Sequence, residues 1–388
     1  MPFLRTRYLL LLLAGTASAH AAEISSNTES VAWTPIAHIQ NRLGLTNMEH
    51  RAEGLVLSNA AHVLYLFAGR RNATLDGTTV WLHLPPRDAA TNDLRDVTRA
   101  DFDTLLRPLL SATAAPPPAV QIVLDAGHGG EDSGARTANG AVQEKQVVLD
   151  IARQVASQLT AAGLQPILTR TGDVTVTLGE RMRLAAAQHA QLFISIHANS
   201  SPSNLYAMGA ETYILPVAGF NGVAENGHGQ TNACPGNRFD GANTQLGFYL
   251  HRRYAPLTDM DRGLKRKRLF VLKEASCPAA LIECGFLTST NDANHLAEGS
   301  YRQKLADAIA AGILDYVSYG ATGLAPPPPP RLALPATNVT TCVSITTNAL
   351  AATPAATNST TLDPTVTNTP PQPPNVSSNP SPSATGAP

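Results

Sequence analysis

Hydrophobic and polar positions alternate with two different periods over residues 119–320. Short apolar runs predict buried strands. Between these runs, apolar residues three or four positions apart predict helices, as in the stripe Val148, Ile151, Val155 and Leu159. The predicted strands are 121–124, 165–169, 192–196, 211–215, 268–272 and 279–282, and the predicted helices are 144–162, 178–189 and 301–317. This alternation predicts an α/β domain whose mixed, mostly parallel sheet carries helices on both faces.

A smaller unit precedes this domain, at residues 31–113. Its alternating, β-rich residues surround Asp76-Gly77, a pair that predicts a hairpin turn. Residues 98–110 have helical spacing. Thr98 or Asp101 can cap this helix by accepting hydrogen bonds from the N–H groups of its first turn. Because no residues here have the spacing of metal ligands, we expect a small α+β accessory domain.

The two ends of the chain differ from these units. Residues 1–22 have the basic start, the short apolar run and the small residues of a cleaved signal peptide. A transmembrane anchor needs about 20 apolar residues, more than this run offers. We therefore expect export to the periplasm or cell envelope, with no membrane span after cleavage.

Residues 114–118 are a proline-rich linker, and residues 324–388 form a tail of low complexity. The tail holds 15 of the 29 prolines, and Arg331 and Asp363 are its only charged residues. It lacks the aromatic and branched side chains needed to offset the entropy of ordering. We expect it to be disordered.

Composition excludes several classes of function. The 28 Lys and Arg residues nearly balance the 29 Asp and Glu residues, for a net charge of −1. This balance argues against a nucleic-acid binder that neutralises phosphates and against a polybasic membrane-surface protein. Four cysteines in 388 residues are too few for a disulfide scaffold. Function must therefore reside in a local group of residues.

The first candidate group is D-A-G-H-G-G at 125–130, directly after a predicted strand. Glycines flank His128 and allow the backbone to approach a ligand closely. A dinucleotide fingerprint fails because Asp132 stands where its last glycine is required, and a phosphate loop fails because no Gly-Lys-Ser/Thr follows. Alone, this motif is a weak indication of a site.

Three further residues stand at the start of a predicted helix or at the end of a predicted strand, where side chains can meet at one edge of a sheet. Glu144 begins a helix, where the macrodipole alone favours a carboxylate. His197 ends an apolar strand, where open α/β sheets bind ligands, although a structural histidine also suits this place. Glu283 ends another apolar strand, and a buried carboxylate is costly unless it is paired or bound to metal.

Together these residues indicate a catalytic zinc site. Two histidines and one glutamate are a usual set of three protein ligands, which leaves the fourth position open for water. Bound zinc lowers the pKa of that water to about 7. A second carboxylate that is not a ligand can carry the proton. No H-E-x-x-H and no C-x-x-C pair occurs, so a zincin arrangement and a structural zinc site are not expected.

These motifs, in this order, resemble the zinc-dependent N-acetylmuramoyl-L-alanine amidases of the amidase-3 type. The resemblance covers about 121–317 and includes the segments around Arg181 and Arg262. It implies His128, Glu144 and His197 as ligands of one Zn²⁺, and Glu283 as the catalytic carboxylate.

The implied reaction is cleavage of peptidoglycan between the lactyl group of N-acetylmuramic acid and L-alanine. Zinc-bound water would attack the lactyl carbonyl with Glu283 as base, and Glu283 would then protonate the departing nitrogen. Asn199 and Arg262 are candidate substrate contacts, although hydrogen bonding within the protein explains them equally well. Two other functions stay open, namely a zinc peptidase acting on the stem peptide and a wall-binding module without catalysis.

Two features depart from the resemblance. In some family members the stretch equivalent to 216–243 carries a helix that plugs the zinc site until a partner removes it. Here its composition favours a loop, so autoinhibition is not indicated, and the sequence does not identify a possible activating protein. Cys284 lies beside Glu283 and either pairs with Cys277 or Cys234 or is a small buried hydrophobic residue, which we favour.

The accessory unit resembles the copper-amine-oxidase N-terminal-like domain, in L-D-G-T-T-V-W-L-H-L-P and D-F-D-T-L-L-R-P-L-L. The resemblance implies no copper here, and the hypothesis is wall binding or positioning. Sedimentation with purified cell wall after deletion of 23–113 tests it, since unchanged binding would reject it.

Overall fold

The computed structural model describes residues 31–89, 93–111, 120–223 and 231–322. The predicted signal peptide, the proline linker and the tail lie outside these residues. None of the described helices is long and apolar enough to cross a membrane.

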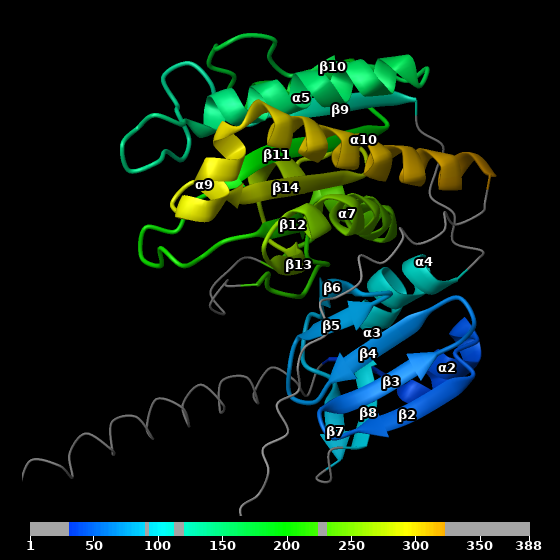
Figure 1. Cartoon of the computed structure of the whole chain (residues 1–388). Helices are drawn as coiled ribbons and strands as arrows, with labels where there is room; N and C mark the ends of the chain where they lie inside the picture. Colours follow the sequence, from blue (N-terminus) through cyan, green and yellow to red (C-terminus); the bar gives the residue numbers. More distant parts are fainter. Residues whose placement is uncertain (1–30, 90–92, 112–119, 224–230, 323–388) are drawn as a thin grey trace, which may run out of the picture. The chain divides into compact units, whose positions relative to one another are not determined.

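One sheet organises the larger domain, as Figure 1 shows. Its strands, in spatial order, are β10 (Gln165–Leu168), β9 (Gln121–Ala126), β11 (Leu192–Asn199), β14 (Ala279–Phe286), β12 (Ala210–Ile214) and β13 (Asp261–Arg266). Every neighbouring pair is parallel except β14 with β12, which is antiparallel. The expected mixed, mostly parallel sheet is confirmed.

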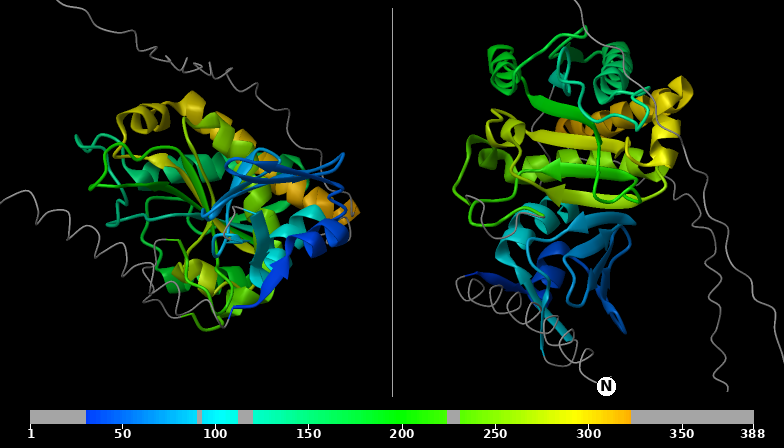
Figure 2. Two further views of the ribbon diagram at one scale, coloured as in Figure 1. Left: turned by 90° about the horizontal axis from the view of Figure 1, so that it is seen from below. Right: turned by 90° about the vertical axis from the view of Figure 1, so that its left-hand side faces the viewer.

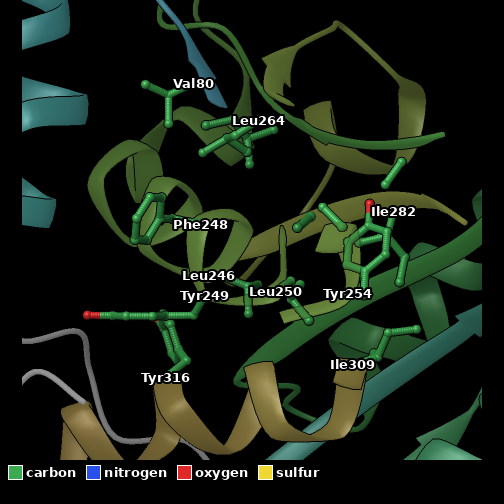
Figure 3. Packing of buried hydrophobic residues seen from close by; sticks show 14 of the residues in the cluster. Val80, Leu246, Phe248, Tyr249, Leu250, Tyr254, Leu264, Ile282, Ile309 and Tyr316 are labelled. Atoms are coloured by element: carbon green, nitrogen blue, oxygen red, sulfur yellow. The ribbon is translucent and has the colours of Figure 1, made fainter. Parts of the chain in front are cut away.

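Helices cover both faces of this sheet, as expected (Figures 1 and 2). The larger core packs beneath α5 (Glu144–Ala161), α7 (Asp240–Tyr254) and α10 (Gly299–Thr322). A smaller core lies under α6 (Leu178–Ala187) and α8 (Phe270–Lys273) on the other face. Figure 3 shows Tyr254 of α7 between Ile282 of β14 and Ile309 of α10. Burying a side chain of this size contributes about 1.5–3 kcal/mol.

The N-terminal unit is α+β, as expected. Its strands are β1 (Trp33–Pro35), β2 (Asn47–Arg51), β3 (Gly54–Ser58), β4 (Val63–Phe67), β5 (Asn72–Leu75), β6 (Thr78–Trp81), β7 (Arg87–Ala89) and β8 (Asp93–Thr98). Its helical segments are α2 (Ile36–Leu43), α3 (Arg99–Asp101), η1 (Phe102–Leu106) and α4 (Arg107–Leu110). The hairpin is confirmed, with φ of 52° at Asp76 and 83° at Gly77. Thr98 is the cap, because its side chain accepts from the N–H of Asp101.

The sheets of the two units are continuous through β6 and β13, which pair in parallel at Val80 and Leu264. The indole of Trp81 donates to the carbonyl of Arg262 at 3.0 Å. The N–H of Thr79 donates to Asp261 at 3.0 Å. The accessory unit therefore holds the strand that carries Arg262.

Three sequence expectations differ from the structure. The run 268–272, predicted as a strand, contains the short helix α8, because so short an apolar run does not distinguish the two conformations. The loop expected over 216–243 gives way at Pro235 to a 3-10 turn, η2 (Pro235–Phe239), and then to α7. Helix α9 (Thr290–Ala297), like α7 and β13, was not predicted.

Burial explains why α7 and β13 escape prediction. Helix α7 is buried over most of its circumference, so it shows no amphipathic stripe. Strand β13 has the polar sequence D-R-G-L-K-R, yet Lys265 and Arg266 are both buried within it. Charged residues are rarely buried without partners, and Lys265 pairs with Glu211.

Candidate metal centre

Three of the predicted residues converge on one point. His128 follows β9, Glu144 begins α5 and His197 lies near the end of β11. Their potential ligand atoms all lie within 4.8 Å of one another. The Oε1 atom of Glu144 is 3.1 Å from Nε2 of His128 and 2.8 Å from Nδ1 of His197.

Glycines allow this convergence. A Cβ atom at Gly127 would lie 2.3 Å from the ring of His197. One at Gly134 would lie 2.4 Å from Oε2 of Glu144. His128 itself has φ of 57°, a left-handed conformation that is uncommon outside glycine and is often found at functional sites. The glycines around His128 therefore leave the space that the three side chains occupy.

Hydrogen bonds fix the carboxylate of Glu144. The N–H of Ala135 donates to Oε2 at 2.7 Å, and the N–H of Ala198 donates to Oε1 at 3.0 Å. Burial acts to raise the pKa of Glu144, but the contacts with His128 and His197 outweigh it and hold the pKa well below its usual value. The carboxylate is therefore ionised at neutral pH.

The three residues fit a zinc ion. Two imidazoles and one ionised carboxylate are a donor set that zinc accepts. On the side away from Glu144, Nδ1 of His128 lies 2.7 Å from Oδ2 of Asp132. Metal-ligating histidines usually donate to such an outer carboxylate, which fixes the ring and its tautomer. The arrangement can hold one divalent cation with an open side.

Glu283 lies beside this group. It pairs in register with His197 across β14 and β11, so the two side chains are on the same face of the sheet. Within the described part of the chain its buried Oε2 atom has no hydrogen-bond partner. Burial, and then the charges of Glu144 and Glu211, raises the pKa of Glu283 well above its usual value. A carboxyl group with these properties is suited to exchanging a proton.

Asn199 and Arg262 meet on Glu211, a residue that the sequence did not single out. Asn199 Nδ2 donates to Oε2 of Glu211 at 3.1 Å, and Arg262 Nε donates to its Oε1. Lys265 and Tyr213 also donate to Glu211, whose side chain is buried. Glu211 lies directly opposite Glu283 in the β12–β14 ladder. The sequence does contain a signal for Glu211, because its carboxylate lies within the predicted strand A-E-T-Y-I. The same kind of signal indicated Glu283.

A second buried network supports the loop that carries His128. Asp125 accepts from the hydroxyls of Thr169 and Ser195, each at 2.7 Å, and pairs with the guanidinium of Arg181. Arg181 also donates to the carbonyl of His128 at 2.9 Å. Asp125 of the D-A-G-H-G-G motif therefore helps to position the loop through Arg181.

Replacing Arg181 by methionine is expected to lower the free energy of unfolding by about 3–5 kcal/mol, since Asp125 would stay buried without its cationic partner. Urea denaturation followed by circular dichroism measures this loss. Arg183→Met, on the same helix but with a side chain 77% exposed, is the control and should change stability by less than about 0.5 kcal/mol. Equal effects of the two substitutions would contradict the network's role.

A pocket of about 340 Å³ adjoins the candidate ligands. His128 and His197 line it together with apolar residues such as Val176, Leu178 and Phe270. Leu178 and Phe270 are 52% and 41% exposed, which is unusual for large apolar side chains. The pocket can therefore accept a molecule with apolar surface next to the metal centre.

Comparisons with known proteins identify the relatives of the larger domain. A family model described as N-acetylmuramoyl-L-alanine amidase matches residues 122–315. The chain is 37% identical over 195 residues to the uncharacterized protein YqiI of Bacillus subtilis (strain 168), a match covering 50% of this chain and 84% of YqiI. It is 36% identical over 198 residues to the N-acetylmuramoyl-L-alanine amidase LytC of the same strain, covering 50% of this chain and 35% of LytC. It is 32% identical over 219 residues to the N-acetylmuramoyl-L-alanine amidase AmiA of Escherichia coli (strain K12), a match covering 50% of this chain and 75% of AmiA.

Proposed function

The chain belongs to the family of N-acetylmuramoyl-L-alanine amidases, and from this premise we propose that it is a zinc peptidoglycan hydrolase. Its reaction is cleavage of the amide between the lactyl group of N-acetylmuramic acid and L-alanine. The observation that carries the proposal is the convergence of His128, Glu144 and His197 beside Glu283, whose Oε2 atom has no hydrogen-bond partner among the described residues. The whole-protein activity is part of the proposal, since the match spans about a third of LytC.

The side chains of His128, Glu144 and His197 would hold one zinc ion. When bound, zinc supplies a water of lowered pKa and an electrophile for a carbonyl oxygen. Glu144 contributes a negative charge that its hydrogen bonds keep ionised. Asp132 holds the ring of His128 from behind, through the 2.7 Å contact at Nδ1.

Glu283 moves the proton in this proposal. Its Oε2 atom accepts a proton from the attacking water and returns it to the amide nitrogen of L-alanine as the bond breaks. The raised pKa suits this exchange, because burial makes the carboxyl group of Glu283 hold a proton more readily than an exposed glutamate does. Glu211, opposite Glu283, accepts hydrogen bonds from Asn199 of β11 and Arg262 of β13. Substrate contacts by Asn199 and Arg262 remain a proposal.

Labelling of new amino termini tests the reaction. Digestion of purified cell wall by the enzyme should produce peptides whose new amino-terminal residue is L-alanine. Only cleavage at the lactyl amide exposes the amino group of this residue. New termini at other amino acids would instead indicate a peptidase of the stem peptide. No new termini would indicate a wall-binding module without catalysis. We further propose that the enzyme reaches its substrate by export, and that residues 31–113 bind or orient it on the wall.

A further inference from the structure

The exposed side chain of Lys267 lies at the edge of the site and has no role in the reaction described above. Its ammonium group lies 5.4 Å from the ring centre of Tyr213. The backbone N–H of Lys267 donates to the carbonyl of Ile214 at 3.0 Å, which fixes the backbone directly after β13. Among the described residues no carboxylate forms an ion pair with Lys267, in contrast to Lys265 two positions earlier.

Tyr213 is a rigid platform for this cation. It is buried, and its hydroxyl donates to Glu211. A cation over an aromatic face gains about 0.5–1 kcal/mol at an exposed site, so the contact restricts the lysine without neutralising it. The ammonium group therefore keeps its capacity to bind an anion.

Lys267 differs from the two cations beside it in its ion pairing. Arg262 and Lys265 both pair with the carboxylate of Glu211. Among the described residues no ion pair joins Lys267 to a carboxylate, so its ammonium group can bind an anionic ligand by a charge-assisted hydrogen bond.

The order of the strands determines which part of the substrate meets Lys267. His197 lies on β11, Glu283 on the adjacent β14 and Tyr213 on β12, the next strand (Figure 1). Glu283 is the group that protonates the departing nitrogen, so the leaving peptide lies on the Glu283 side of the scissile bond. Lys267, above Tyr213, is then on the peptide side of the site.

We propose that Lys267 is a specificity-determining residue that binds a free carboxylate of the stem peptide next to the scissile L-alanine. This inference rests on the proposed amidase function. The residue after L-alanine in a stem peptide is D-glutamate, with a free carboxylate, or its amidated form, D-isoglutamine. A charge-assisted hydrogen bond distinguishes the two, because the carboxamide carries no charge.

Two muropeptides that differ only in D-glutamate or D-isoglutamine at this position test the proposal. We expect the wild-type protein to hydrolyse the D-glutamate form with a kcat/KM about tenfold higher. Lys267→Met should lose this preference by slowing on the D-glutamate form alone, whereas Lys267→Arg should retain it. Lys304→Met, at an exposed position on α10, is the matched control and should behave as wild type.

The outcomes separate this proposal from the underlying function. If Lys267→Met keeps the wild-type preference, or slows equally on both muropeptides, carboxylate recognition by Lys267 is wrong and the amidase function stands. If the wild-type protein cleaves neither muropeptide before L-alanine but cuts elsewhere in the peptide, the proposed function itself is wrong.

Discussion

Glu283→Gln is expected to slow hydrolysis of peptidoglycan by about 10²–10⁴-fold, the usual contribution of a positioned acid–base group. Glutamine has nearly the same shape as glutamate but cannot exchange the proton. Glu283 is not among the three residues whose ligand atoms converge, so bound zinc should stay at the wild-type level. Release of soluble wall fragments measures the rate, and elemental analysis of the purified protein measures the metal.

Glu298→Gln is the matched control for this substitution, because it makes the same change at an exposed position before α10. It should leave both the rate and the zinc content unchanged. Hydrolysis at the wild-type rate by Glu283→Gln would show that another group carries the proton. Loss of zinc from this variant would show that Glu283 belongs to the ligand set.

His197→Ala is expected to abolish both zinc binding and hydrolysis, because it removes one of the three ligands that we propose for the ion. A chelator should have the same effect on the wild-type protein, and added zinc should restore activity. Asp132→Asn should weaken zinc binding or activity by only about 10–100-fold, since Asp132 contacts His128 rather than the ion. Zinc titration of the purified variants should show a larger loss of affinity in His197→Ala than in Asp132→Asn.

His189→Ala, at an exposed position after α6, is the control for loss of a histidine. It should bind zinc and hydrolyse the wall as the wild-type protein does. Full activity after chelation, or in His197→Ala, would mean that the converging residues serve another purpose, such as a hydrogen-bonded structural cluster.

The sequence predicted the convergence of the site because each residue directly follows an apolar run or opens a helix. His197 and Glu283 follow apolar runs whose length and composition are typical of buried strands, and Glu144 opens a helix with a clear apolar stripe. In a parallel sheet such ends meet at one edge. The structure brings them together there, with His197 and Glu283 in register.

The role of Glu211 could not be predicted in the same way. Its partners Arg262 and Lys265 come from β13, a strand whose polar sequence predicts no burial. Strand β13 is also paired with β6 of the accessory unit, more than 180 residues earlier in the chain. Pairings between such distant segments leave no periodic signal, because they depend on tertiary packing rather than on local propensity.

Mass spectrometry of muropeptides after digestion of purified cell wall, with and without chelator, is the decisive experiment for metal-dependent cleavage before L-alanine. We expect glycan chains free of peptide together with free peptides that begin with L-alanine, and no products once zinc is removed. Cuts between amino acids, or the same products in the presence of chelator, would contradict this expectation.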